Sequence, residues 1–327
     1  MQLDTPVALI LFNRPESTAR VFEAIRDAAP RRIFLIADGP RETHPGDVEA
    51  CAAARAAVRD VDWDCRVYEN FSSYNLGCGL RPSTGISWVF EHVDRAIILE
   101  DDCLPHPSFF RFCEELLGRY AGDERIMLVS GNNFIQNRYS PPSSYFFNRN
   151  IGFWGWATWR RAWQHFDMRP SGWPDLRETG WLEDILGDVA QAAYWRDIFE
   201  RAHQKRGTAD HWDYQWTFAV WSQNGLAATP SVNLVSNIGF GAGATHTRAN
   251  ASHLADLPVR AMEFPLEHPL HVVRDRTADD LVFHHAFQKA GPSLRRRLRQ
   301  GVVRLAPAGV RRILRHVSSA ATSWSAR

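Results

Sequence analysis

The 327-residue sequence lacks the features that mark several broad classes of protein. No apolar stretch reaches the roughly 18 to 20 residues that cross a bilayer. The first residues show neither the basic segment nor the cleavage site of a secretory signal. The five cysteines are odd in number and show no Cys-x-x-Cys spacing, which supports neither a disulfide framework nor a zinc site. We therefore expect a cytoplasmic protein without a transmembrane segment.

Acidic residues are missing from one end of the chain. Residues 291–327 hold nine arginines and no acid, although the net charge of the whole chain is only +1. The remaining 290 residues carry 29 basic and 37 acidic side chains, a net charge of −8. A nucleic-acid-binding domain normally presents a basic face, so this acidic body argues against nucleic acid as a partner.

The basic tail, residues 291–327, has an amphipathic pattern. Leu294, Leu298, Val302 and Leu305 share one face at helical spacing, and arginines cover the other. This pattern is typical of a helix that lies on anionic lipid. The alternatives are a solvated tail or a helix docked on the acidic body, and the sequence leaves all three open.

The first 133 residues alternate short apolar runs with helical stretches, which predicts a doubly wound, Rossmann-like α/β arrangement. The predicted strands are Val7–Phe12, Ile33–Ala37, Cys65–Tyr68, Ala96–Leu99 and Ile126–Val129. The predicted helices are Glu16–Asp27, Asp47–Val58, Thr84–Val93 and Ser108–Tyr120. We expect residues 134–290 to form a second half of the same domain.

Tryptophan is concentrated in that second half, where ten of the thirteen lie between Trp154 and Trp221. Large aromatic side chains most often fill a core, and we expect that role for most of these ten. A minority can line a carbohydrate cleft, because the flat apolar face of a sugar stacks on indole.

Three carboxylates, Glu100, Asp101 and Asp102, directly follow the apolar strand at residues 95–99. Negative charge at a strand end can bind a divalent metal, whose coordination a phosphorylated ligand completes. An acidic turn is the plainer interpretation. However, ligands of such sheets bind beyond the carboxyl ends of the strands, where polar loops also follow the first two strands at residues 13–15 and 38–40.

A carboxylate at Asp38 can accept hydrogen bonds from a nucleobase or a ribose hydroxyl, although Asp-Gly-Pro is also a good turn. Gly77 and Gly79 permit close approach of backbone to a ligand, and Arg81 offers bidentate donors to a diphosphate. Neither the GxGxxG nor the Walker spacing is present, which counts against dinucleotide and ATP chemistry of those kinds.

Taken together, these motifs resemble the GT-A fold glycosyltransferases, in particular bacterial family-2-like enzymes and the N-acetylglucosaminyltransferase I group. The resemblance spans residues 6 to 248. It rests on residues 11–15, 37–39, 75–77 and 98–102, followed by Pro105 and Phe109-Phe110. It implies a mixed sheet flanked by helices, an aromatic-rich acceptor half and transfer of a sugar from a nucleotide donor.

The resemblance also implies roles for individual residues. Asp102 would bind Mn²⁺ or Mg²⁺, with Glu100 and Asp101 supporting the donor. Asn13 and Asp38 would hold the base and ribose, and the other expected donor contacts are Arg14, Gly77 and Arg81. In the glycine-rich segment 237–247, Gly241 would belong to a lid and His246 would approach the metal.

The acceptor side is expected around residues 152–163 and 211–216, with Trp154, Trp156 and Trp212 near the sugar. Asp213 would be the general base of an inverting transfer. The register of this segment is open by a residue, and Asp210 is the alternative base.

We therefore expect a metal-dependent, inverting glycosyltransferase that moves a sugar from a UDP-sugar to a hydroxyl acceptor in glycan or glycolipid synthesis. The acceptor would be a glycan or a lipid-linked molecule, with the tail at the inner face of the cell membrane. Two alternatives are a catalytically silent protein that binds sugar nucleotides or glycans, and a nucleotidyltransferase. The latter would need a glycine-rich first loop, which residues 12–15 do not provide.

Overall fold

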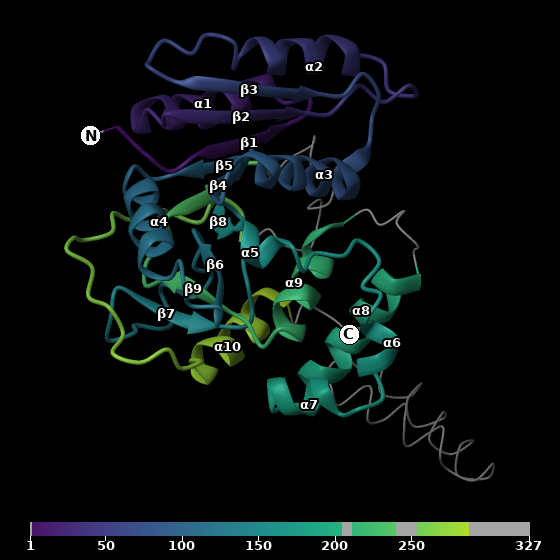
Figure 1. Ribbon diagram of the computed structural model, residues 1–327, viewed down its shortest axis with the longest axis vertical. Helices are drawn as coiled ribbons and strands as arrows, with labels where there is room; N and C mark the ends of the chain where they lie inside the picture. Colours follow the sequence, from purple (N-terminus) through teal and green to yellow (C-terminus); the bar gives the residue numbers. More distant parts are fainter. Residues whose placement is uncertain (1, 205–210, 240–253, 288–327) are drawn as a thin grey trace, which may run out of the picture. The chain divides into compact units, whose positions relative to one another are not determined.

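The computed structural model describes residues 2–204, 211–239 and 254–287 (Figure 1). The described residues up to Ala286 belong to one compact unit. The basic tail lies outside the described residues, so its membrane association stays a prediction. Within the described ranges, no helix combines the length and the apolar character needed to cross a membrane.

The compact unit is built on an eight-stranded mixed sheet with the order β3-β2-β1-β4-β8-β6-β9-β7. The first four strands in this order are mutually parallel, and β8 runs antiparallel to both β4 and β6. The strands are β1 (Val7–Leu11), β2 (Arg32–Ala37), β3 (Arg66–Phe71), β4 (Arg95–Glu100), β6 (Ile126–Ser130), β7 (Tyr145–Asn148), β8 (Trp156–Trp159) and β9 (Leu226–Pro230). With its flanking helices, this sheet confirms the predicted α/β fold class.

Helices cover both faces of the parallel part of the sheet. Alternate residues such as Leu9 and Leu35 pack in one core with α1 (Pro15–Ala28), α2 (Asp47–Ala56) and α4 (Ser108–Arg119). The intervening residues face α3 (Gly77–His92), where Trp88 lies edge-on to Phe34 at 5.4 Å between ring centroids. Two-sided burial accounts for the continuous apolar runs of these strands.

The start of α3 differs from the prediction, because the helix begins at Gly77 and not at Thr84. No residue next to Gly77 caps it locally. Instead, the Asp38 carboxylate accepts hydrogen bonds from the amides of Leu76 at 2.8 Å and Gly77 at 2.9 Å. A cap supplied from the end of β2 leaves no local start signal in the sequence.

The helices that follow β8 provide much of the aromatic core. They are α5 (Arg160–Trp163), α6 (Trp173–Leu176), α7 (Trp181–Leu186), α8 (Val189–Gln204), α9 (Asp213–Ser222), α10 (Arg276–Val282) and a π-helix at Phe283–Phe287. Five tryptophans from this half are fully buried, namely Trp156, Trp173, Trp195, Trp216 and Trp221. The core-filling interpretation is therefore confirmed for them. One sheet takes strands from both sides of residue 133, so the two predicted halves share it. The division at that residue stays a prediction.

A small second sheet places residues 237–239, the described start of the glycine-rich segment, beside the acidic run. Strand β5 (Cys103–Pro105) pairs antiparallel with β10 (Val235–Asn237), and Cys103 stands opposite Asn237. The Ile238 amide donates to the Asp102 carbonyl at 2.8 Å. The start of the glycine-rich segment is thereby tied to the turn that carries the acids.

Candidate functional site

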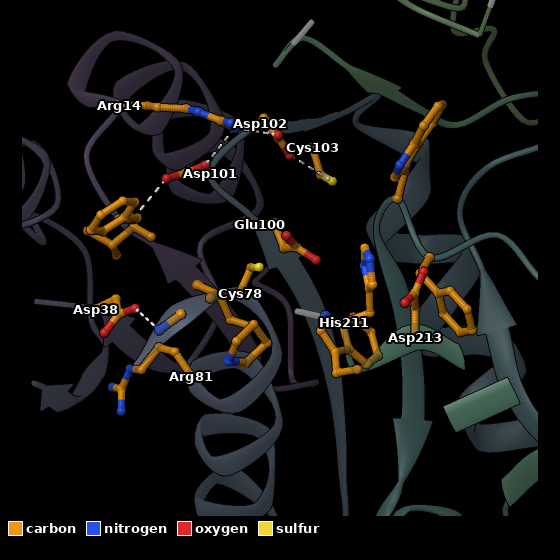
Figure 2. A pocket seen from close by; sticks show the side chains of 18 of the residues that line it. Arg14, Asp38, Cys78, Arg81, Glu100, Asp101, Asp102, Cys103, His211 and Asp213 are labelled. Atoms are coloured by element: carbon orange, nitrogen blue, oxygen red, sulfur yellow. Dashed lines mark hydrogen bonds and ion pairs between the residues drawn. The ribbon is translucent and has the colours of Figure 1, made fainter. Parts of the chain in front are cut away.

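A cavity of about 470 Å³ opens at the carboxyl ends of β1, β2 and β4. Its walls also include the start of α3, Trp154, the segment from His211 to Asp213, and Asn237. Asp38, Glu100 and Asp213 all line it, although they are far apart in the sequence (Figure 2). The fold thus assembles the predicted donor and acceptor segments around one space, as expected for the switch region of such a sheet.

The acidic run forms one wall of the cavity and contacts a single guanidinium (Figure 2). Arg14 Nη1 lies 2.6 Å from Asp102 Oδ2 and 3.6 Å from Asp101 Oδ1. The second oxygen of Asp101 accepts a hydrogen bond from the Phe12 amide at 2.9 Å. Three consecutive carboxylates therefore face one positive charge.

The excess of negative charge contributes to raised pKa values of two of these acids. Burial, followed by the neighbouring carboxylates of Asp102, Asp101 and Asp213, raises the pKa of Glu100 to about 8. Burial, followed by the charge of Asp102, raises the pKa of Asp101 to about 7. A cation entering here would relieve this repulsion.

The donor set fits a metal shared with a ligand better than a metal held by protein alone. The described residues include no group of three or more His, Cys, Asp or Glu side chains placed to hold an ion. Mg²⁺ is commonly held by one or two carboxylates together with substrate phosphates. Asp102 meets that requirement, since its Oδ1 atom has only a long 3.4 Å contact with Asn237 Nδ2 and a 3.5 Å contact with the Cys103 thiol. His246 lies outside the described residues.

Asp38 is buried, and its hydrogen-bonding capacity is already used. Its Oδ1 accepts from the amides of Gly39 and Leu76, and its Oδ2 accepts from the Gly77 amide and from Asn75 Nδ2 at 3.0 Å. The carboxylate therefore anchors the loop that enters α3. The predicted contact of Asp38 with a base or ribose stays a prediction.

Two other predicted donor residues are engaged with protein groups. The Arg81 guanidinium donates to the carbonyl and side-chain oxygens of Asn70, and Figure 2 shows it directed away from Glu100. Asn13 donates to Asp47 Oδ1 at 2.9 Å and is not among the residues that line the cavity. Gly77, in contrast, lines the cavity with a φ of 79°, which suits glycine.

Arg41, which is not among the residues predicted from sequence, also lines the cavity. Its guanidinium is held by Asp47, the first residue of α2. An acidic residue in the first turn of a helix is common, so nothing in the sequence distinguishes Asp47 from an ordinary helix start.

The acceptor-side residues divide between cavity wall and core. Asp213 begins α9 and lines the cavity together with Trp154 and Trp212. Trp156 is buried behind them, stacked on Trp212 at 5.5 Å between ring centroids. It therefore supports the wall and does not form it. Asp210 and Gly241 lie outside the described residues.

No protein-family model and no curated protein matches the chain. Among solved structures, a mannosyltransferase from Pyrobaculum calidifontis in complex with GDP-Man and Mn²⁺ is 9% identical with a TM-score of 0.36, covering 67% of this chain and 70% of that chain. An inositol-1-phosphate CTP transferase from T. maritima is 10% identical with a TM-score of 0.35, covering 70% and 86%. Mouse xyloside xylosyltransferase 1 is 12% identical with a TM-score of 0.34, covering 69% and 84%. Similarity at this level carries no argument about activity.

Proposed function

We propose that this chain is a metal-dependent, inverting glycosyltransferase that moves a sugar from a nucleoside diphosphate donor, a UDP-sugar, to a hydroxyl acceptor. The supporting observation is the single cavity that contains both the acidic run and Asp213. Such a transfer needs groups that hold the diphosphate and a carboxylate that takes a proton, and we assign these two roles to the acidic run and to Asp213.

The acidic end suits the departing diphosphate. Breaking the bond between the anomeric carbon and the phosphate oxygen leaves negative charge on the nucleoside diphosphate. A divalent cation on Asp102 would neutralise part of that charge. Arg14 lies 2.6 Å from Asp102 and can donate to the same phosphate oxygens.

The opposite end suits the acceptor. As the acceptor oxygen attacks the anomeric carbon from the face opposite the diphosphate, the Asp213 carboxylate would take the hydroxyl proton. Trp154 and Trp212, which line the cavity nearby, offer apolar surface to a sugar ring. A glycan or lipid-linked acceptor belongs to this proposal, with residues 291–327 at an anionic membrane surface.

Turnover assays with the full-length protein test the proposal. Nucleotide sugars are incubated with Mn²⁺ and candidate acceptors, and release of nucleoside diphosphate is measured for wild type and Asp213→Asn. The expected loss is about 10² to 10⁴-fold, with nucleotide binding retained. Asp184→Asn, at an exposed position of α7, is the matched control. Metal-linked nucleotide binding without turnover of any donor would instead identify a silent binding protein, and absence of both would reject the proposal.

A further inference from the structure

Arg41 and Asp47 form an ion pair at the edge of the cavity that the proposed chemistry does not use. Arg41 Nε donates to Asp47 Oδ2 at 2.6 Å and Arg41 Nη2 donates to Asp47 Oδ1 at 3.0 Å. The Arg41 amide also donates to Oδ2, at 3.1 Å. Asp47 is buried, whereas a third of the Arg41 side chain is exposed. The carboxylate therefore fixes the plane of a guanidinium that lines the cavity.

This pairing removes Arg41 from the role of a free cation. The Arg41 hydrogen bonds, together with one from Asn13, hold the pKa of Asp47 well below its usual range. Asp47 therefore stays ionised and offsets the charge of Arg41. Two of the five N–H donors of the guanidinium, one on Nε and one on Nη2, are thus directed at Asp47, and the neutralised pair attracts a phosphate less strongly than a free cation would. Among the described residues, Nη1 has no hydrogen-bond partner, so its two N–H groups are donors that the pairing with Asp47 holds in a fixed plane.

Phe12 lies beside Arg41 in the lining of the cavity. The Arg41 Cζ atom lies 5.3 Å from the centroid of the Phe12 ring, within the range of a cation–π contact. Phe12 itself is fixed to the acidic run through its amide bond to Asp101. Phe12 thus connects the acidic run to Arg41 along one wall of the cavity. The charge of Arg41 is neutralised by Asp47, and its guanidinium is held rigidly after the end of β2.

We infer that Arg41, positioned by Asp47, contacts the base of the bound nucleotide and favours a base that presents a carbonyl oxygen. The inference rests on the proposed function and names the base class of its donor. A fixed N–H donor pairs with the O4 carbonyl of uracil, whereas cytosine presents an N–H donor at the same position. Two donors facing each other leave a polar group unpaired, which disfavours cytosine.

Calorimetric titration of the full-length protein with UDP and with CDP, both with Mn²⁺, tests the inference. Wild type is expected to bind UDP about tenfold more tightly than CDP, the size of effect of one hydrogen bond to a charged group. Arg41→Met retains an apolar stem over Phe12 but removes the donors. It should reduce the UDP-to-CDP ratio to about one, mainly through weaker UDP binding.

Asp47→Asn provides the second arm, because the loss of its charge releases the guanidinium. It should reduce the same ratio, a change that a loss of stability alone would not cause. Asp123→Asn is a matched control, since Arg125 makes the same three contacts with Asp123 through its amide, Nε and Nη2 at an exposed site. This control should leave the ratio unchanged.

Three results would overturn the inference while leaving the proposed function intact. Wild type could bind UDP and CDP equally, Arg41→Met could leave the ratio unchanged, or Arg41→Met could weaken both nucleotides equally. The last result would identify Arg41 as a phosphate contact. A wild-type protein that binds neither nucleotide would instead contradict the proposed function itself.

Discussion

Arg14 donates from Nη1 to Asp102 Oδ2 at 2.6 Å, so the residue predicted to bind a metal is paired with a protein cation in this structure. A divalent ion at Oδ1 and the guanidinium at Oδ2 would compete for the charge of the same carboxylate. A diphosphate would remove the conflict, because it can accept hydrogen bonds from Arg14 while it shares the ion with Asp102. We therefore expect metal and nucleotide to bind cooperatively.

Replacing Arg14 should uncouple the two ligands. Arg14→Gln is expected to bind Mn²⁺ about tenfold more tightly without nucleotide, because a competing charge is lost, and to bind UDP more weakly. Electron paramagnetic resonance of free Mn²⁺, with and without UDP, measures both effects. Arg31→Gln, which breaks only the exposed pair with Asp4, is the control. Unchanged Mn²⁺ affinity in Arg14→Gln would contradict the competition.

The raised pKa of Glu100 predicts the direction of a pH effect on stability. In metal-free protein, the folded state keeps a proton on Glu100 up to about pH 8, whereas the unfolded chain releases it near the ordinary value of 4.5. The free energy of unfolding should therefore fall as the pH rises from about 5 to about 8. Glu100→Gln should flatten this decline by about 1 kcal/mol or more. Thermal melts in EDTA measure it, and parallel pH profiles of the two proteins would refute the assignment.

Gly239 lies so close to Asp102 that a larger residue would disturb the carboxylate. A Cβ atom at Gly239 would stand 2.2 Å from Asp102 Oδ2 and 2.7 Å from Asp102 Cβ. Gly239→Ala should therefore weaken metal-linked UDP binding and destabilise the fold by about 1 to 3 kcal/mol. Gly118→Ala, in α4 with nothing within 4 Å of the added carbon, should leave binding intact. Equal UDP affinity in both variants would argue against a tight fit at Gly239.

Asp38 is expected to contribute to stability through its four hydrogen bonds. Asp38→Ala leaves the amides of Leu76 and Gly77 without their acceptor, which should cost about 3 kcal/mol. Denaturant unfolding measures this cost, and proteolysis near residue 77 should increase. Asp64→Ala, at an exposed site, should change stability by less than about 0.5 kcal/mol. A similarly small effect at Asp38 would show that the loop does not depend on it.

The parts of this architecture that were predictable from sequence are those encoded locally. The apolar runs of β1, β2 and β4 are buried on both faces, so periodicity and composition marked them clearly. The acids after β4 follow their strand directly, which placed them at the sheet edge. Helices α1 and α4 also begin within a residue of the predicted positions.

Features that depend on long-range contacts were not predictable. The start of α3 is capped by Asp38 from another strand, and Arg41 is oriented by Asp47 across a turn. Trp154 and Trp156 are two residues apart, yet one lines the cavity and the other is core. Trp154 precedes β8, so strand alternation does not apply to it.

A crystal structure of the protein with UDP and Mn²⁺ tests the central claim most directly. We expect UDP in this cavity, an anomalous manganese peak within bonding distance of Asp102, and Arg14 turned toward the diphosphate. Nucleotide bound at another surface, or manganese located away from Asp102, would contradict it.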